Sequence, residues 1–152
     1  MAASRRRGSL RPRLERAVGQ VLAWEGARRG RSGRARVELT LLDAVAMRRL
    51  NRRAMGRRDL TDVLAFALPQ PDGALLGDVY ICPAAADRWV KNGGTEKGEG
   101  RVEEELLRLA VHGTLHVLGY DHPDGPGRTR SAMWRRQERY VHRVLGRRGA
   151  ER

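Results

Sequence analysis

The chain has 152 residues, a formal charge of +13 and a hydrophobic fraction of 40%, which suits one globular domain with a single core. Cys82 is the only cysteine, which excludes an intrachain disulfide and favours a reducing compartment. No apolar run follows the basic N-terminus and no stretch approaches the roughly 20 apolar residues of a membrane span, so we expect a cytoplasmic protein without a membrane partner.

Apolar periodicity and turn signals predict an α+β chain rather than a regular alternation of strands and helices. Residues 1–12 are basic and poor in apolar groups, so we expect a disordered arm there, one domain over 13–146 and a tail over 147–152. The expected elements are helices at 13–26, 43–55, 83–91, 101–117 and 131–145, and strands at 37–42, 62–68 and 75–82.

Capping and turn residues mark several of these boundaries. Asp43 is the expected N-cap of the second helix, and either Thr129 or Ser131 caps the last one. Asp72-Gly73 predicts a hairpin turn between the last two strands. The glycine-rich stretch 92–100 is expected to be a flexible loop.

Three of the four histidines lie in the string HGTLHVLGYDH, residues 112–122. His112 and His116 are four residues apart, so a helix places both imidazoles on one face. Gly119 lets the chain leave the helix and turn back, which brings His122 round to face them. Three imidazoles with an open fourth position are typical of a catalytic zinc site.

The spacing of these histidines matches the frame HExxHxxGxxH of the metzincin proteases. Gly113 stands where those enzymes carry the glutamate that acts as general base, which argues against a peptidase. Asp121, next to a predicted ligand, is either a carboxylate that assists the metal site or a turn-stabilising residue before His122-Pro123.

The string HGTLHVLGYDH resembles the signature of the YbeY family of endoribonucleases, the bacterial rRNA maturation factors. Further similarity runs from about residue 35 to 145. Leu50-Asn51 followed by TDVLAF (61–66) is similar to the LN…TDVLSF segment of that family, and LLGDVYIC (75–82) to its LGD-containing strand. Met133 and Glu138 fit its C-terminal helix.

The resemblance implies a single α+β domain with a small mixed sheet and one Zn²⁺ held by His112, His116 and His122. It also implies metal-dependent cleavage of single-stranded RNA, maturation of the 16S rRNA precursor at its 3′ end, a part in ribosome quality control, and association with the ribosome or its small subunit in the cytoplasm.

Met55 is the main departure from the family pattern, because it occupies a position that usually carries a cleft arginine. A phosphodiester transition state needs a cation to share its charge, and methionine supplies none. Arg53, Arg57 and Arg58 lie nearby and are our candidates for that catalytic role. The alternative is an RNA-binding or ribosome-binding assembly factor of weak catalytic activity, whose zinc is structural.

The high positive charge predicts a polyanionic partner, although all basic residues except Lys91 and Lys97 are arginines, a skew that coding bias also produces. The Gly/Arg loop 26–36 either grips RNA phosphates or is a solvated loop. Its candidate RNA-binding residues are Arg28, Arg29, Arg31 and Arg34.

Overall fold

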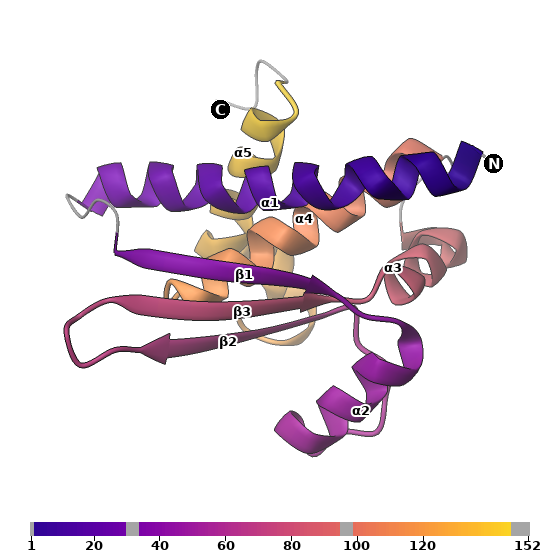
Figure 1. The fold of residues 1–152 in the computed structure, drawn as a ribbon, viewed down its shortest axis with the longest axis horizontal. Coiled ribbons are helices and arrows are strands. Elements are labelled where there is room, and N and C mark those ends of the chain that lie inside the picture. The colour runs from indigo at the N-terminus through magenta and orange to yellow at the C-terminus, as the bar shows by residue number, and fades with distance from the viewer. Residues whose placement is uncertain (1, 30–33, 95–98, 147–152) are drawn as a thin grey trace.

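The computed structural model describes the backbone of residues 2–29, 34–94 and 99–146, and the side chains of 10–29, 34–92 and 101–146. Its elements are α1 (Ala2–Arg29), β1 (Ala35–Leu41), α2 (Ala44–Met55), β2 (Val63–Pro69), β3 (Leu75–Ile81), α3 (Pro83–Trp89), the π-helical turn η1 (Val90–Gly94), α4 (Glu99–Val117), the 3-10 turn η2 (Gly125–Arg130) and α5 (Ala132–Val144). Figure 1 shows the sheet as one layer, α1 and α4 packed along it, and α2 set apart at one end. The predicted α+β fold with a small sheet is confirmed.

The sheet has three strands in the order β1-β3-β2 and is mixed, as the resemblance implied. β3 pairs parallel with β1, with Leu39 beside Val79. β2 pairs antiparallel with β3 through the predicted hairpin, where Gly73 takes a φ of 83° and the Ala74 N–H donates to Asp72 Oδ1 over 3.0 Å. The turn residues therefore fix the register that places the central strand against the helices.

Helix α4 lies against the central strand because both elements carry a glycine at the contact. A Cβ added to Gly113 would lie 2.6 Å from Val79 Cγ1, and one added to Gly77 would lie 2.3 Å from Val117 Cγ1. The side of α4 that faces away from the sheet packs on α1 and α5 through a second cluster of buried residues. Its members are Val21, Val111, Leu115, Met133, Tyr140 and Val141. The central helix is therefore held on both sides, which fixes the side chains at its end.

The N-terminal helix is longer than the sequence predicted, since residues 2–12 are helical and not a disordered arm. Pro12 lacks one backbone donor but does not end the helix. Leu10 packs against the core, and Arg11 binds Glu15 one turn later over 2.9 Å. These contacts offset the weak helix propensity of residues 2–12.

The remaining boundaries follow the predictions closely. Asp43 caps α2 by accepting the Ala46 N–H over 2.8 Å, and Ser131 caps α5 by accepting the Trp134 N–H over 3.2 Å. The stretch 92–100 begins as part of η1 and ends inside α4, and only residues 95–98 of it lie outside the described residues. The expected tail 147–152 also lies outside them.

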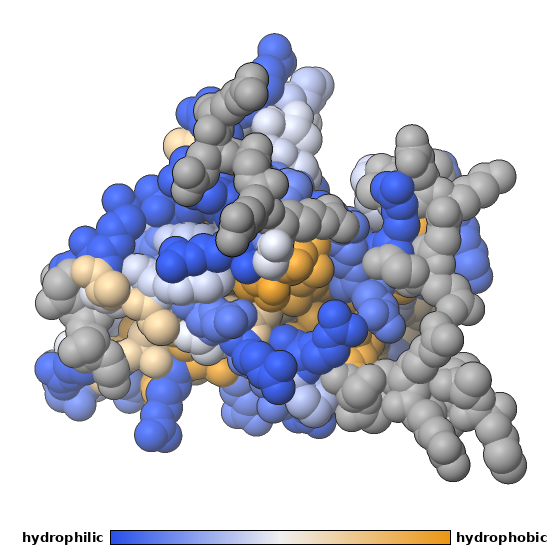
Figure 2. All heavy atoms as spheres, turned by 90° about the horizontal axis from the view of Figure 1, so that it is seen from above, coloured by the Kyte–Doolittle hydropathy of each residue, from blue (hydrophilic) through white to orange (hydrophobic). Residues whose placement is uncertain are grey.

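Hydrophilic side chains cover most of the face seen in Figure 2, with smaller apolar areas between them. None of the helices in the described part of the chain is long and apolar enough to cross a membrane.

Candidate metal centre

The three predicted histidines converge. α4 carries His112 and His116 one turn apart, Gly119 leaves the helix with a φ of 98°, and the chain returns with His122. His122 Nε2 lies 3.2 Å from His116 Nε2 and 3.3 Å from His112 Nε2. Their ligand atoms all lie within 4.8 Å of one another, so the predicted cluster exists in the structure.

The other ring nitrogen of each histidine faces an oxygen. His116 Nδ1 lies 3.0 Å from the Tyr120 carbonyl, and His122 Nδ1 lies 3.0 Å from the Pro123 carbonyl. His112 Nδ1 lies 2.6 Å from Gln137 Oε1. Because a carbonyl oxygen only accepts, each Nδ1 carries the proton and donates. Each Nε2 therefore presents its lone pair to the shared centre.

This arrangement fits a metal ion. Tetrahedral coordination with metal–nitrogen distances of about 2.0–2.1 Å separates the ligand nitrogens by roughly 3.3 Å, which matches the Nε2 separations of 3.2 and 3.3 Å. Three lone pairs at this range repel one another unless a cation lies between them. His112, His116 and His122 are the residues that could hold it, and all three ring orientations are set before the ion binds.

His112 and His116 are also kept neutral, which is the form that binds metals. Burial, assisted by the nearby charges of His116, His122 and Arg128, lowers the pKa of His112 to about 4 despite its bond to Gln137. Burial and His122 likewise lower the pKa of His116. At neutral pH, protons therefore compete little with a metal ion at these two rings.

A buried carboxylate behind the cluster supports the turn that carries His122. Glu25 on α1 is 1% exposed and accepts a hydrogen bond from the Tyr120 hydroxyl over 2.7 Å. The same carboxylate also accepts from Tyr140 and from Arg136. Tyr120 is the residue whose carbonyl accepts from His116, so the carboxylate on α1 fixes the position of a metal-site partner.

Sequence reasoning missed both Glu25 and Gln137. They lie far from the histidine string along the chain, and no local pattern marks them. The available signal was that Glu25 directly follows the apolar run VLAW of α1, because a buried charge requires partners.

Comparison of the chain with known proteins identifies relatives that are named endoribonucleases. The family model described as endoribonuclease YbeY matches residues 3–145. Endoribonuclease YbeY of Micrococcus luteus is 35% identical over 122 residues, which cover 75% of this chain and 73% of the relative. The corresponding protein of Moorella thermoacetica is 41% identical over 121 residues, covering 72% of this chain and 74% of the relative.

The chain belongs to the YbeY endoribonuclease family. A solved structure supports the same conclusion. The solution structure of a Thermotoga maritima protein has a TM-score of 0.54 and 29% identity, and the match covers 91% of this chain and 81% of that one. The YbeY resemblance inferred from the sequence is therefore confirmed.

Asp121 and the three candidate catalytic arginines have different surroundings in the structure. Asp121 Oδ1 accepts the His122 N–H over 2.8 Å, which is the turn-stabilising arrangement. Arg53, Arg57 and Arg58 are exposed, and no contact in the described part of the chain joins them to the histidines. Asp121 thus lies beside the cluster, whereas the catalytic role of the three arginines stays a prediction.

Arg128 is the cation that sequence reasoning overlooked. It lies on η2, close after His122, with its guanidinium carbon 5.5 Å from the centre of the Trp134 ring. Its positive charge contributes to the lowered pKa of His112 and His116. The same charge opposes the rise that burial causes in the pKa of Asp62. A positive charge is therefore present near the metal centre although Met55 supplies none.

Three of the predicted RNA-binding arginines bind the protein itself. Arg28 donates to the Tyr120 hydroxyl over 2.9 Å, and Arg29 donates to the Leu118 carbonyl over 3.2 Å. Arg34 donates to the Asp72 carbonyl over 2.6 Å. Arg31 lies outside the described residues. The charges of these three are thus partly engaged within the fold.

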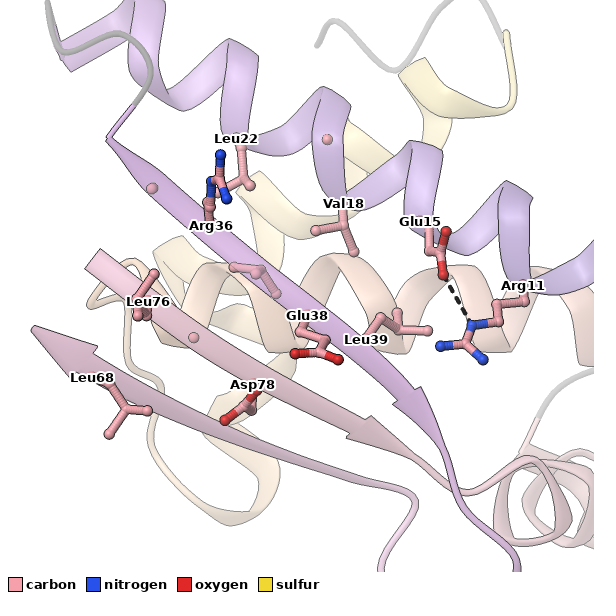
Figure 3. Close-up of a pocket in the computed structure, with 14 residues that line it drawn as sticks. Arg11, Glu15, Val18, Leu22, Arg36, Glu38, Leu39, Leu68, Leu76 and Asp78 are labelled. Atoms are coloured by element: carbon pink, nitrogen blue, oxygen red, sulfur yellow. Dashed lines mark hydrogen bonds and ion pairs between the residues drawn. The ribbon is translucent and has the colours of Figure 1, made fainter. Parts of the chain in front are cut away.

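A wide groove of about 680 Å³ lies between α1 and β1 (Figure 3). The ion pair of Arg11 and Glu15 borders it, and Leu22, Leu76 and Asp78 are among its lining residues. No histidine lines the groove, so it is separate from the candidate metal centre.

Proposed function

We propose that the chain is a metal-dependent endoribonuclease that cleaves single-stranded RNA, with Zn²⁺ held by His112, His116 and His122. The observation that carries this proposal is the convergence of three Nε2 atoms whose Nδ1 partners are already fixed. Bound zinc supplies a Lewis acid that polarises a phosphoryl oxygen and lowers the pKa of a bound water.

The residues of the chain itself supply the remaining functions. Gln137, Tyr120 and Pro123 hold the imidazoles in the binding tautomer. A cation near the scissile phosphate stabilises the charge that develops there. Arg128 is the best-placed candidate, and Arg53, Arg57 and Arg58 stay candidates because they follow α2 or lie in its last turn. Asp121 stays a candidate base beside His122.

The finer parts of the proposal come from membership of the YbeY family. They are maturation of the 16S rRNA precursor at its 3′ end, a role in ribosome quality control, association with the ribosome or its small subunit, and a cytoplasmic location. The domain that performs these functions is proposed to span residues 13–146.

The second candidate function is a catalytically weak RNA-binding or ribosome-binding assembly factor with a structural zinc. Met55 favours it, because this exposed apolar side chain, 52% accessible, stands at a position where the family usually carries an arginine. The two candidates differ in whether the zinc-loaded protein cuts RNA.

A cleavage assay on single-stranded RNA tests the proposal, with the wild type, His116→Ala, Met55→Arg and Arg128→Gln measured side by side, with and without chelator. We expect the wild type to cut, chelation and His116→Ala to abolish cutting, and Arg128→Gln to slow it about 100-fold. Elemental analysis of the zinc content shows whether a variant is inactive because it has lost Zn²⁺ or because it lacks the arginine charge.

Two outcomes would contradict the nuclease. If the wild type is silent and Met55→Arg cuts, the chain is the binding factor of the second candidate. If no form cuts while the protein retains zinc and binds RNA, the metal is structural.

A further inference from the structure

The outer face of α2 carries four arginines, Arg48, Arg49, Arg52 and Arg53, called here the α2 arginine face. At 100° per residue the four fall on the side of the helix opposite Met47 and Asn51. Met47 and Asn51 are buried, whereas all four arginines are exposed. Arg57 and Arg58 follow directly and are exposed as well. Six arginines thus lie within eleven residues of chain.

None of these six arginine side chains has a hydrogen bond or an ion pair in the described part of the chain. Other arginines do have partners. Arg108 binds Glu138 over 2.8 Å, Arg136 binds Glu25 over 3.2 Å, and Arg34 lies 3.4 Å from Asp72. These three arginines have acidic partners, whereas the six arginines on and after α2 have none among the described residues.

This arrangement costs stability. Arg48 and Arg52, and likewise Arg49 and Arg53, are like charges four residues apart, a spacing at which they repel each other and destabilise a helix. The negative end of the helix dipole compensates only the arginines in the last turn, Arg52 and Arg53. An external polyanion would relieve the repulsion at all four positions.

The position of α2 connects this face with the metal centre. Figure 1 shows α2 beyond the end of the sheet where β1 finishes and β2 begins. Asn51 Nδ2 donates to the Asp59 carbonyl over 2.9 Å, which holds the segment that returns from α2 to the sheet. That segment leads into β2, which pairs with β3. Gly113, next to His112 on α4, packs on Val79 of β3, so the segment leads from α2 to the strands beneath the histidine helix.

We propose that the α2 arginine face binds the phosphate backbone of single-stranded RNA and feeds the strand towards the histidine cluster. This inference rests on the proposed function, because it assumes an RNA substrate. The occupant is a polyphosphodiester, and the arginines are proposed to contact its phosphates, which carry no sequence information. Arg28, Arg29 and Arg34, which have partners within the protein, are expected to contribute less.

Binding of a fluorescently labelled 2′-O-methyl oligonucleotide to the zinc-loaded full chain tests the inference, with its integrity checked on a gel. The test variant is Arg48→Gln/Arg49→Gln/Arg52→Gln. The matched control is Arg16→Gln/Arg88→Gln/Arg139→Gln, which removes the same charge from three exposed, dispersed arginines. Thermal unfolding checks that both variants fold.

We expect the α2 variant to bind at least about 10-fold more weakly, and its slope of log K against log salt to fall by about 2, since each contact to a single strand contributes about 0.7. The control should bind within about two-fold of wild type with an unchanged slope. Equal weakening by both variants would overturn the inference in favour of net charge alone. An α2 variant that binds as wild type would overturn it too.

Two further results separate this inference from the proposed function. If the wild type binds the oligonucleotide through α2 yet never cuts RNA, the inference stands and the nuclease proposal fails. If α2 binds an acidic protein instead, a polyglutamate peptide will displace the oligonucleotide from wild type but not from the α2 variant at equal ionic strength, which overturns the RNA assignment.

Discussion

Gln137 shows how one neutral residue prepares the metal centre. It is buried on α5, and its Oε1 accepts from His112 Nδ1 over 2.6 Å. A carboxylate there would also accept, but an apolar residue would leave the buried Nδ1–H without a partner. Sequence reasoning identified Glu138 beside it, which in the structure binds Arg108 instead. The similarity to the family located helix α5 but did not identify Gln137 as the side chain that contacts His112.

Replacing Gln137 with leucine should therefore weaken zinc binding by about 10–100-fold, because the ring of His112 loses the partner that fixes its tautomer. Competition with a chromophoric chelator measures the affinity. Gln137→Glu is the matched control, since it keeps an acceptor at the same position, and it should bind zinc at least as well as wild type. Equal affinity of Gln137→Leu and wild type would show that the contact does not orient the ligand.

At the scale of elements, the contact between α4 and β3 depends on two glycines. Gly113 occupies the position at which metzincins carry their catalytic glutamate, and from sequence its absence argued against a peptidase. The structure adds a packing reason, because Gly113 faces Val79 of the sheet and not the centre of the histidine cluster. A larger side chain there would push the helix that carries His112 and His116 away from the sheet.

Gly113→Ala is expected to lower the free energy of unfolding by about 1–3 kcal/mol, the usual cost of overpacking a close contact. Chemical denaturation measures it. Gly19→Ala is the control: Gly19 also lies within a helix, but nothing lies within 4 Å of an added Cβ, and the change should stabilise α1 by up to about 1 kcal/mol. If both variants gain stability, the α4–β3 contact is looser than the geometry indicates.

At the scale of the whole molecule, local signals predicted most elements. Asp43, Gly119 and the Asp72-Gly73 turn act through their own backbone and side-chain geometry, so a single sequence suffices to place them. The histidine cluster was predictable for the same reason, since one helix turn and one glycine bring the rings together. The helical state of residues 2–12 was not predictable from local signals, because it depends on contacts such as that of Leu10 with the core.

Long-range contacts explain the rest of what the sequence did not reveal. Glu25, Tyr120, Arg136 and Tyr140 come from α1, from the turn after α4 and from α5, and only the folded chain brings them together. The same holds for Arg128, whose turn is irregular and carries no periodic pattern. Local patterns thus located the metal ligands. The residues that support the site or place a positive charge near it could be identified only in the structure.

Glu25 links three parts of the molecule, so its neutralisation should affect global stability. Burial raises the pKa of Glu25, but hydrogen bonds from Tyr140 and Tyr120 and the charges of Arg136 and Arg29 outweigh burial, and the pKa lies below its ordinary value. A carboxyl whose pKa is lower in the folded than in the unfolded protein stabilises the fold above the unfolded pKa. That stabilisation disappears as pH falls through the folded value.

At pH 7 we expect Glu25→Gln to destabilise the protein by about 2 kcal/mol, since three arginines lose a buried counter-charge. The difference from wild type should shrink as the pH is lowered below the usual range of a glutamate. Urea denaturation at a series of pH values measures it. Glu15→Gln, on the same helix but in the exposed pair with Arg11, should change stability by less than about 0.5 kcal/mol at any pH. A Glu25→Gln effect that does not vary with pH would mean that Glu25 acts through packing and hydrogen bonds rather than through its charge.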